Sequence, residues 1–395
     1  YNIAIGRNTL AANTTGARNT AVGGLAGDAI TTGQRNELVG YFAGSGITTG
    51  EYNTAMGYEA LGLTTTGVRN IAIGTQALYG NVAGDNSVAI GFSALTNQNP
   101  ASNVDMFNTA VGHQTGRAVT TGVQNTFIGA LAGFSNTTAG NNTAVGYSAM
   151  TANTTGANNC AFGLNALSVN TTGTENHSSG YATLSNNTTA SYNTAVGARA
   201  LTANTTGANN TATGYRALLA NTTANSNTAV GMYALTSNTT GANNNALGYQ
   251  GLNSNTTGGY NVAIGNAALY ANTTASNNTA VGYATLLANT TGTGNTTSGF
   301  ESLKSNTTAS WNTSTGYQSL KANTTGAQNT AFGTWGLLSN TTGANNTATG
   351  YEALYYNTTA SNNTGVGYQA LKANTTGTDN VAVGSNALDA NTTGN

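Results

Sequence analysis

The chain has 395 residues, of which 38% are hydrophobic and only 5% are charged, and its formal net charge is −1. The lack of a basic surplus excludes a nucleic-acid partner, and no apolar run reaches the ~18 residues that a membrane span needs. Cys160 is the only cysteine, so a disulfide within the chain is excluded. We expect Cys160 to occupy a repeat position that usually holds Thr.

A single seventeen-residue unit recurs along the whole chain. Its equivalent glycines run from Gly6 to Gly384 at this interval, except that the step from Gly91 to Gly112 is longer by four residues. The four extra residues fall within 96–107 and predict a loop insertion there. Hydrophobic residues that keep such a register argue against disorder. We therefore expect residues 1–395 to form one continuous array of 23 repeats without separate domains.

The unit reads T-A-V-G-Y-x-A-L-x-A-N-T-T-G-A-x-N, and we number its positions 1 to 17 from the Thr, as in Thr143–Asn159. A short β-branched stretch favours a strand, and the Asn, Gly and Thr clusters favour turns. Such a unit is too short for a helical hairpin, and a strict period is typical of a solenoid. The sequence predicts an all-β parallel β-solenoid (a β-roll or β-helix) with one coil per repeat. At the usual strand spacing, 23 coils would give a rod roughly 110 Å long.

Each position of the unit then has an expected role. Position 3 (Val145) and position 8 (Leu167) should point into the coil and stack on their equivalents. Position 4 needs either a positive φ or close backbone approach, as in Gly146 and Gly163. The position 17 asparagines should form a ladder between coils or cap a turn, and the structural residues expected in this role include Asn159 and Asn210.

The strand should have a second face opposite position 3, formed by Ala144 and Gly146. A smooth face of small residues would allow another chain to pack closely, and plain solvent exposure is the alternative. From Tyr147 onward, Tyr recurs at position 5 of every second repeat. This longer period indicates either duplication of a pair of units or different neighbours for alternate coils.

An internal exchange links two positions of the unit. Three copies carry Gly at position 8 and an aliphatic residue at position 11, as the pairs Gly27 with Ile30, Gly44 with Ile47, and Gly116 with Val119. This exchange predicts that positions 8 and 11 border the same interior volume. A fourth copy, with Gly133, keeps Asn136 and instead carries Leu131 and Phe134, so the exchange is not a rule of the array.

Two short stretches resemble a known family. Asn86–Gly91 reads Asn-Ser-Val-Ala-Ile-Gly and matches the signature of trimeric autotransporter adhesin heads, to which Tyr260–Gly265 is also close. The string NTAVGYxALxANTTG is similar to repeats of bacterial surface proteins and phage-type tail fibres. The resemblance implies a left-handed β-roll with three identical chains side by side. It also implies an extracellular, cell-surface or virion location and a role in adhesion or reach.

Asn-Thr-Thr sequons at position 11 are the most frequent motif, and they fit N-glycosylation acceptors. The alternative is that Asn and Thr serve turns and ladders, which the aliphatic residues Ile30, Ile47 and Val119 at this position favour. The candidate acceptors are Asn13, Asn136, Asn153, Asn170, Asn187, Asn204, Asn221, Asn238, Asn255, Asn272, Asn289, Asn306, Asn323, Asn340, Asn357, Asn374 and Asn391.

Nothing in the sequence points to catalysis, a cofactor or a metal. His113 and His177 occupy different repeat positions, and the acidic residues are scattered singly. We therefore predict a non-catalytic fibre or adhesin shaft whose partners are identical chains, side by side or end to end. The alternative is a ligand-binding surface, for ice or for host glycans, displayed by the Thr- and Asn-rich turns. Because the chain begins and ends in mid-repeat without a cap, we expect it to belong to a longer array.

Overall fold

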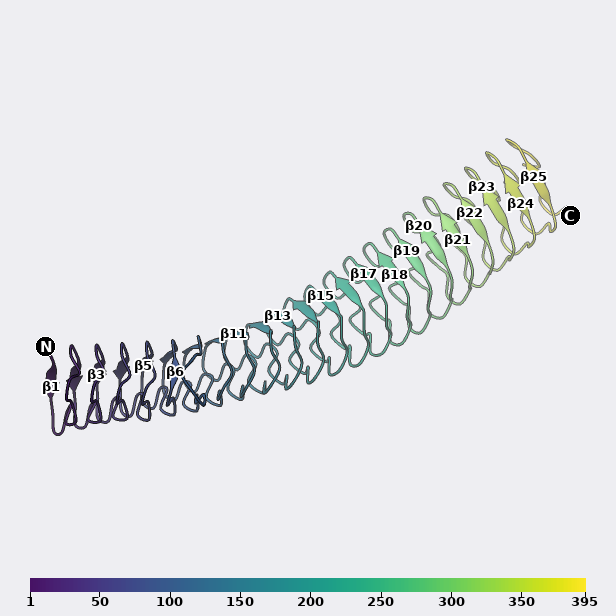
Figure 1. The fold of residues 1–395 in the computed structure, drawn as a ribbon. Coiled ribbons are helices and arrows are strands. Elements are labelled where there is room, and N and C mark those ends of the chain that lie inside the picture. Colours follow the sequence, from purple (N-terminus) through teal and green to yellow (C-terminus); the bar gives the residue numbers. More distant parts are fainter. The chain divides into compact units, whose positions relative to one another are not determined.

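The computed structural model describes residues 1–395, and it contains strands and turns but no helix. The chain forms two compact units, Tyr1–Ala198 and Arg199–Asn395. Each unit is a parallel β-solenoid in which one repeat makes one coil, as the sequence predicts, and the strand of each repeat pairs with that of the next repeat (Figure 1).

The strands are short because the turns take up most of each repeat. The strands of the first unit are β1 (Ile3–Ile5), β2 (Thr20–Val22), β3 (Glu37–Val39), β4 (Thr54–Met56), β5 (Ile71–Ile73), β6 (Gly84–Asp85), β7 (Val88–Ile90), β8 (Val104–Asp105), β9 (Thr109–Val111), β10 (Thr126–Ile128), β11 (Thr143–Val145), β12 (Cys160–Phe162), β13 (His177–Ser179) and β14 (Thr194–Val196). Those of the second unit are β15 (Thr211–Thr213), β16 (Thr228–Val230), β17 (Asn245–Leu247), β18 (Val262–Ile264), β19 (Thr279–Val281), β20 (Thr296–Ser298), β21 (Thr313–Thr315), β22 (Thr330–Phe332), β23 (Thr347–Thr349), β24 (Thr364–Val366) and β25 (Val381–Val383).

Neighbouring coils pair in register, so that each repeat position lies beside its own equivalent. In β11 and β12, Ala144 is opposite Ala161, and Val145 is opposite Phe162. The four-residue insertion does not disturb this register, because β7 pairs directly with β9. The inserted loop adds one small parallel pair of its own, β6 with β8.

The structure reverses the predicted direction of the strand. Position 2 points inward, and Ala144 is fully buried, whereas position 3 points outward, as Val39 and Ile128 show with exposed fractions of 38% and 41%. The prediction that position 3 fills the core, and that Ala144 lies on an outer face, is therefore wrong. A coil this short encloses a narrow interior, and small residues at positions 2 and 7 let its opposite walls approach. Leu167 at position 8 fills that interior, as expected.

The glycine at position 4 lies against the next coil and is not part of a smooth outer surface. Gly146 has a φ of 138°, and a Cβ atom on it would be 2.5 Å from the carbonyl oxygen of Gly163. Both predicted reasons for glycine, a positive φ and close backbone approach, hold at this position. Positions 6, 8 and 16 also have positive φ although they rarely hold glycine; Ser148, Met150 and Asn158 are examples.

The predicted ladder of position 17 asparagines is confirmed and runs through the buried interior. Asn244 illustrates its bonding: its backbone N–H donates to Oδ1 of Asn227 at 2.9 Å, and its Nδ2 donates to the carbonyl of Gly258 at 2.8 Å. Its own Oδ1 accepts from the backbone N–H of Asn261 at 3.0 Å. Each such amide therefore joins three consecutive coils and satisfies backbone groups that water cannot reach.

Ser87 interrupts this ladder, and Gln98 bridges the gap. Gln98 is buried at position 11, where its Nε2 donates to Oγ of Ser87 at 3.0 Å and its Oε1 accepts from Nδ2 of Asn108 at 2.9 Å. The longer glutamine side chain therefore replaces the contact that Ser87 is too short to make. The two departures from the repeat compensate for each other.

We expect Asn244→Ala to destabilise its coil by about 1–3 kcal/mol, because it leaves the backbone N–H of Asn261 buried without an acceptor, whereas the carbonyl of Gly258 still accepts from Nδ2 of Asn255. Hydrogen exchange should show a loss of protection at the Asn261 amide. The control is Asn245→Thr, which places the commonest residue at exposed position 1 and should change stability by less than about 0.5 kcal/mol. Equal protection of the Asn261 amide in both variants would contradict the proposed role of the ladder.

Candidate functional site on the outer faces of the coil

The outward side chains of positions 1, 3 and 5 form the first outer surface, which we call the strand face. Position 3 holds mainly Val, Ile, Leu or Phe, and position 5 is often Tyr. Tyr147 is 56% exposed and Phe162 is 40% exposed. The strand face is therefore the opposite of the polar surface that a solvated sheet usually presents.

Aromatic side chains at position 5 stack along the solenoid. In the second unit the Tyr283 and Phe300 ring centroids are 5.2 Å apart, and those of Phe300 and Tyr317 are 5.3 Å apart, with nearly parallel planes. A second such pair, Tyr351 and Tyr368, is 5.5 Å apart. In-register coils bring identical positions to the distance at which rings stack.

The exposed apolar area of the strand face is large for one protein surface. In the second unit its exposed aromatic side chains are Tyr215, Tyr249, Tyr283, Phe300, Tyr317, Phe332, Tyr351 and Tyr368, with exposed fractions between 38% and 51%. Together they present roughly 600 Å² of surface. This area is at the upper end of the range for the largest apolar patch of a typical monomer, before Leu247, Met232 and Ile264 on the same face are added.

Cys160 lies on the strand face in β12, where its neighbours at position 1 are Thr143 and His177. It occupies a position that usually holds Thr, as expected, and it is partly exposed. His113 is at position 5, where its ring stacks on that of Phe92 at 5.3 Å, whereas His177 is at position 1 of another coil. The two histidines therefore occupy different parts of the strand face. No group of three or more His, Cys, Asp or Glu side chains could hold a metal ion.

The turn after position 10 holds the predicted glycosylation acceptors, and the structure argues against glycans on most of them. Apart from Asn13 and Asn391, which are half-buried, the asparagines of the sequons are buried. Nδ2 of Asn238, the atom that a glycan would modify, donates to Oδ1 of Asn221 and to the carbonyl of Gly241, both at 2.9 Å. A glycan there would displace buried hydrogen bonds, so these asparagines serve the interior ladder in the folded coil.

The threonines of the same turn are only partly available to a ligand. Thr154 at position 12 donates its hydroxyl to the carbonyl of Thr171 in the next coil at 3.0 Å. Thr155 at position 13 is exposed. The turn therefore presents one row of exposed threonines at position 13 and, beside it, a row at position 12 whose hydroxyls are already bonded to the next coil.

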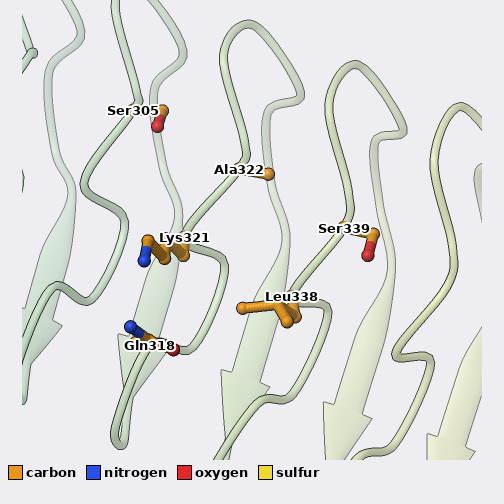
Figure 2. A pocket seen from close by; sticks show the side chains of 6 residues that line it. All are labelled: Ser305, Gln318, Lys321, Ala322, Leu338 and Ser339. Carbon is orange, nitrogen blue, oxygen red and sulfur yellow. The ribbon is translucent and has the colours of Figure 1, made fainter.

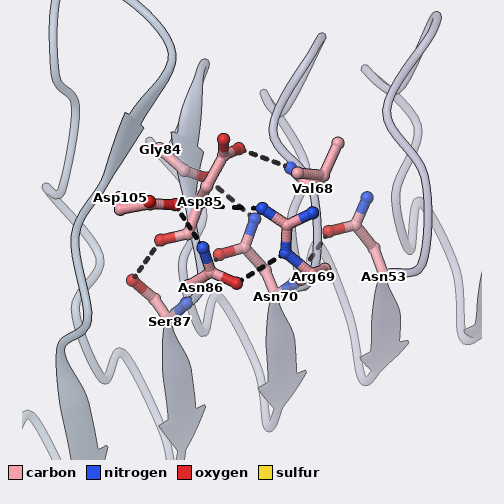
Figure 3. Close-up of polar contacts among 9 residues, drawn as sticks. All are labelled: Asn53, Val68, Arg69, Asn70, Gly84, Asp85, Asn86, Ser87 and Asp105. Carbon is pink, nitrogen blue, oxygen red and sulfur yellow. Dashed lines mark hydrogen bonds and ion pairs between the residues drawn. The ribbon is translucent and has the colours of Figure 1, made fainter.

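A polar cluster forms where the inserted loop pairs with the preceding coil through β6 and β8 (Figure 3). Asp85 accepts from the backbone N–H of Val68 at 2.7 Å, and Nε of Arg69 donates to Oδ1 of Asn86 at 2.7 Å. Asp105 lies opposite Asp85 in the β6–β8 pair and receives a hydrogen bond from Asn86. Burial raises the pKa of Asp85 above its ordinary value. Arg69 supplies the countercharge, at 3.8 Å from Asp105, so the cluster ties the loop to the solenoid.

Positions 6, 9 and 10 form a second outer surface, which we call the groove face, and each unit has at least one cavity on it. The larger cavity, in the second unit, has a volume of about 360 Å³ and is lined by Ser305, Gln318, Lys321, Ala322, Leu338 and Ser339 (Figure 2). The smaller one, in the first unit, has a volume of about 190 Å³ and is lined by Phe42, Ser45, Glu59, Gly62, Leu63 and Tyr79.

An ion-pair network borders the larger cavity. The carboxylate of Glu301 accepts from Nζ of Lys304 at 2.6 Å and from Nζ of Lys321 at 2.8 Å. Nε2 of Gln318 also donates to it at 2.9 Å. The hydrogen bonds from Lys304 and Lys321 lower the pKa of Glu301 from its ordinary value to about 2. Glu301 therefore stays ionised at neutral pH and holds both lysines in place.

The sequence did not predict the strand face or the groove face, although signals for both were present. Tyr recurs at position 5, and all three lysines of the chain, Lys304, Lys321 and Lys372, stand at position 9. The structure contains no helix long and apolar enough to cross a lipid bilayer. No protein-family model matches the chain, and no curated protein matches it either.

Proposed function

We propose that this chain is a non-catalytic structural shaft of an extracellular or virion-borne fibre, built from identical chains packed side by side. The observation that carries the proposal is that hydrogen bonds of the chain run from coil to coil along the solenoid axis. Strand pairs and buried amides such as Asn244 connect equivalent positions of successive repeats, from coil to coil along the solenoid. Such bonding stiffens the array along its axis, and the resemblance to adhesin heads and tail-fibre repeats supports the same role.

Identical chains are the partners that best fit the strand face. A stable interface buries about 800 Å² on each partner, and the aromatic side chains of one unit alone offer roughly 600 Å². Charged residues are rare on this face, since position 3 holds none at all. A second copy brings the same apolar rows at the same coil spacing, so its ridges match those of the first along the full length of a unit.

We expect oxidation or a short bifunctional maleimide to link chains through Cys160, because this single cysteine lies on the proposed interface. The control chain carries Cys160→Thr together with Thr155→Cys, which moves the only thiol to the exposed turn. Gel electrophoresis should show linked dimers for the natural chain and monomers for the control. Equal linking of both chains, or a monomeric mass at all concentrations, would exclude packing through the strand face.

Electron micrographs of the purified chain test the shaft itself. Uniform elongated particles whose width corresponds to more than one chain support it. Compact globular particles would overturn it, whatever the outcome of the cross-linking experiment.

A further inference from the structure

The groove face of the second unit has a composition found nowhere else in the chain. Position 9 there reads Lys304, Lys321, Leu338, Tyr355 and, one coil further, Lys372. In-register stacking places these side chains in one row with a step of about 4.8 Å per coil. The row holds two cationic, two apolar and one cationic side chain in succession, beside small side chains at position 10 such as Ser305, Ala322 and Ser339.

The network at Glu301 leaves one positive charge without a partner carboxylate. Lys304 and Lys321 share this single carboxylate, and their side chains remain 32% and 35% exposed. The carboxylate accepts from both lysines and from Gln318, while Oε1 of Gln318 accepts from the indole N–H of Trp335 at 3.1 Å. The carboxylate of Glu301 and Oε1 of Gln318 already accept hydrogen bonds. The network therefore offers a ligand mainly N–H donors.

The cavity beside this network combines these donors with an apolar wall. Lys321, Ser305 and Ser339 contribute an ammonium and two hydroxyls, while Leu338 and Ala322 contribute hydrocarbon (Figure 2). A donor-rich corner with a surplus positive charge suits a carboxylate or sulfate. The adjoining hydrocarbon suits the C–H face of a sugar ring, and Tyr355 extends that apolar surface along the row.

We propose that this groove binds an acidic polysaccharide, with a carboxylate or sulfate on Lys321 and the attached sugar ring against Leu338. A polymer is favoured because Lys372 repeats the cationic group three coils, or about 14 Å, beyond Lys321. Glu352 offsets the charge of Lys372 at 2.6 Å, so Lys372 offers a ligand N–H donors, and the surplus charge of the row lies at Lys304 and Lys321. The binding is independent of the shaft role, since it uses the groove face and leaves the strand face free.

The cavity of the first unit provides a natural comparison. Glu59 stands at the same repeat position as Glu301 and accepts from Nε2 of Gln76 at 2.9 Å, as Glu301 does from Gln318. The position 9 residues beside Glu59 are Gly62 and Tyr79, so no lysine donates to the carboxylate of Glu59 as Lys304 and Lys321 do to that of Glu301. This cavity therefore lacks the cationic donor, and we assign the polysaccharide site to the second unit alone.

Titration of the full chain with polygalacturonate, dextran sulfate and neutral dextran tests the proposal. We expect at least one of the acidic polymers to bind and dextran not to bind, and the two acidic polymers distinguish a carboxylate from a sulfate. Lys321→Gln should weaken binding about tenfold, as expected for the loss of one charged hydrogen bond. Lys321→Arg should stay within about threefold because it retains the charge.

Arg18→Gln is the matched control, because it removes one positive charge from an exposed turn of the first unit. It should leave the affinity unchanged. The Lys321→Gln chain should keep the circular dichroism spectrum of the natural chain, because Lys304 still pairs with Glu301. Absence of binding to both acidic polymers would overturn the proposal. So would an equal loss in Arg18→Gln, or equally tight binding of a single-stranded DNA oligonucleotide.

Discussion

Replacing Phe127 with Ala should destabilise the first unit by about 3–5 kcal/mol, the usual cost of deleting a buried aromatic side chain. Phe127 is one of two bulky residues at position 2 of the interior, where most coils have Ala, and it is 1% exposed. A Cβ atom on Gly116 would be 2.9 Å from its ring, and one on Gly133 would be 2.7 Å away. The ring thus fills the space that Leu occupies at position 8 of other coils.

Because the ring of Phe127 fills the space beside two glycines, larger residues at these glycines should restore the stability that Phe127→Ala removes. Adding Gly116→Leu and Gly133→Leu to Phe127→Ala should recover most of the stability, because φ is 59° at both glycines and close to the 49° of Leu95. Thermal unfolding and hydrogen exchange of the coils that contain β9 to β11 would measure the loss and the recovery. A triple variant no more stable than Phe127→Ala alone would show that the glycines do not make room for the ring.

The same geometry refines the exchange that the sequence revealed. Leu38, the other bulky residue at position 2, lies between Gly27 and Gly44, with Ile30 and Ile47 filling the remaining space. The prediction that positions 8 and 11 border one volume is confirmed. The structure also explains the fourth copy, which keeps Asn136 beside Gly133, because the ring of Phe127 takes the space at Gly133. The sequence contained a signal for this packing, namely a large residue at position 2 with glycine at position 8 of the same coil and of the preceding coil.

Gly248→Ala should cost about 2–5 kcal/mol, whereas Gly251→Ala three residues later should be neutral or slightly stabilising. Gly248 stands at position 4 with a φ of 132°, and a Cβ atom there would be 2.6 Å from the carbonyl oxygen of Gly265. Gly251 stands at position 7, where a Cβ atom would meet nothing closer than 3.7 Å. Alanine occupies position 7 in most other coils.

Both variants alter one coil by a single methyl group, so the comparison isolates the backbone conformation and the contact between coils. Hydrogen exchange at the Gly265 amide, which donates to the carbonyl of Leu247 at 2.8 Å, reports the local effect. Protection lost in Gly248→Ala and kept in Gly251→Ala is the expected result. The reverse order, or no difference, would contradict a packing role for position 4.

The sequence by itself determined the coil length, the parallel pairing and the buried asparagine ladder. A strict seventeen-residue period leaves in-register stacking as the arrangement in which every coil meets an equivalent neighbour. The departures at Ser87 and Gln98 and the glycines at position 8 were also visible in the sequence. Their partners were not, because contacts across the interior depend on which side chains face each other.

Only the tertiary structure decided which face of the strand is buried. Alternation along a strand permits either face to point inward, and hydrophobicity alone favoured Val145 over Ala144. The narrow coil has room only for a small residue such as alanine on the inward face of the strand. The left-handed backbone at positions 6, 8 and 16 folds the opposite wall close to the strand and brings Leu167 into the remaining space. That choice places the aliphatic and aromatic side chains of positions 3 and 5 on the outside, and so creates the strand face.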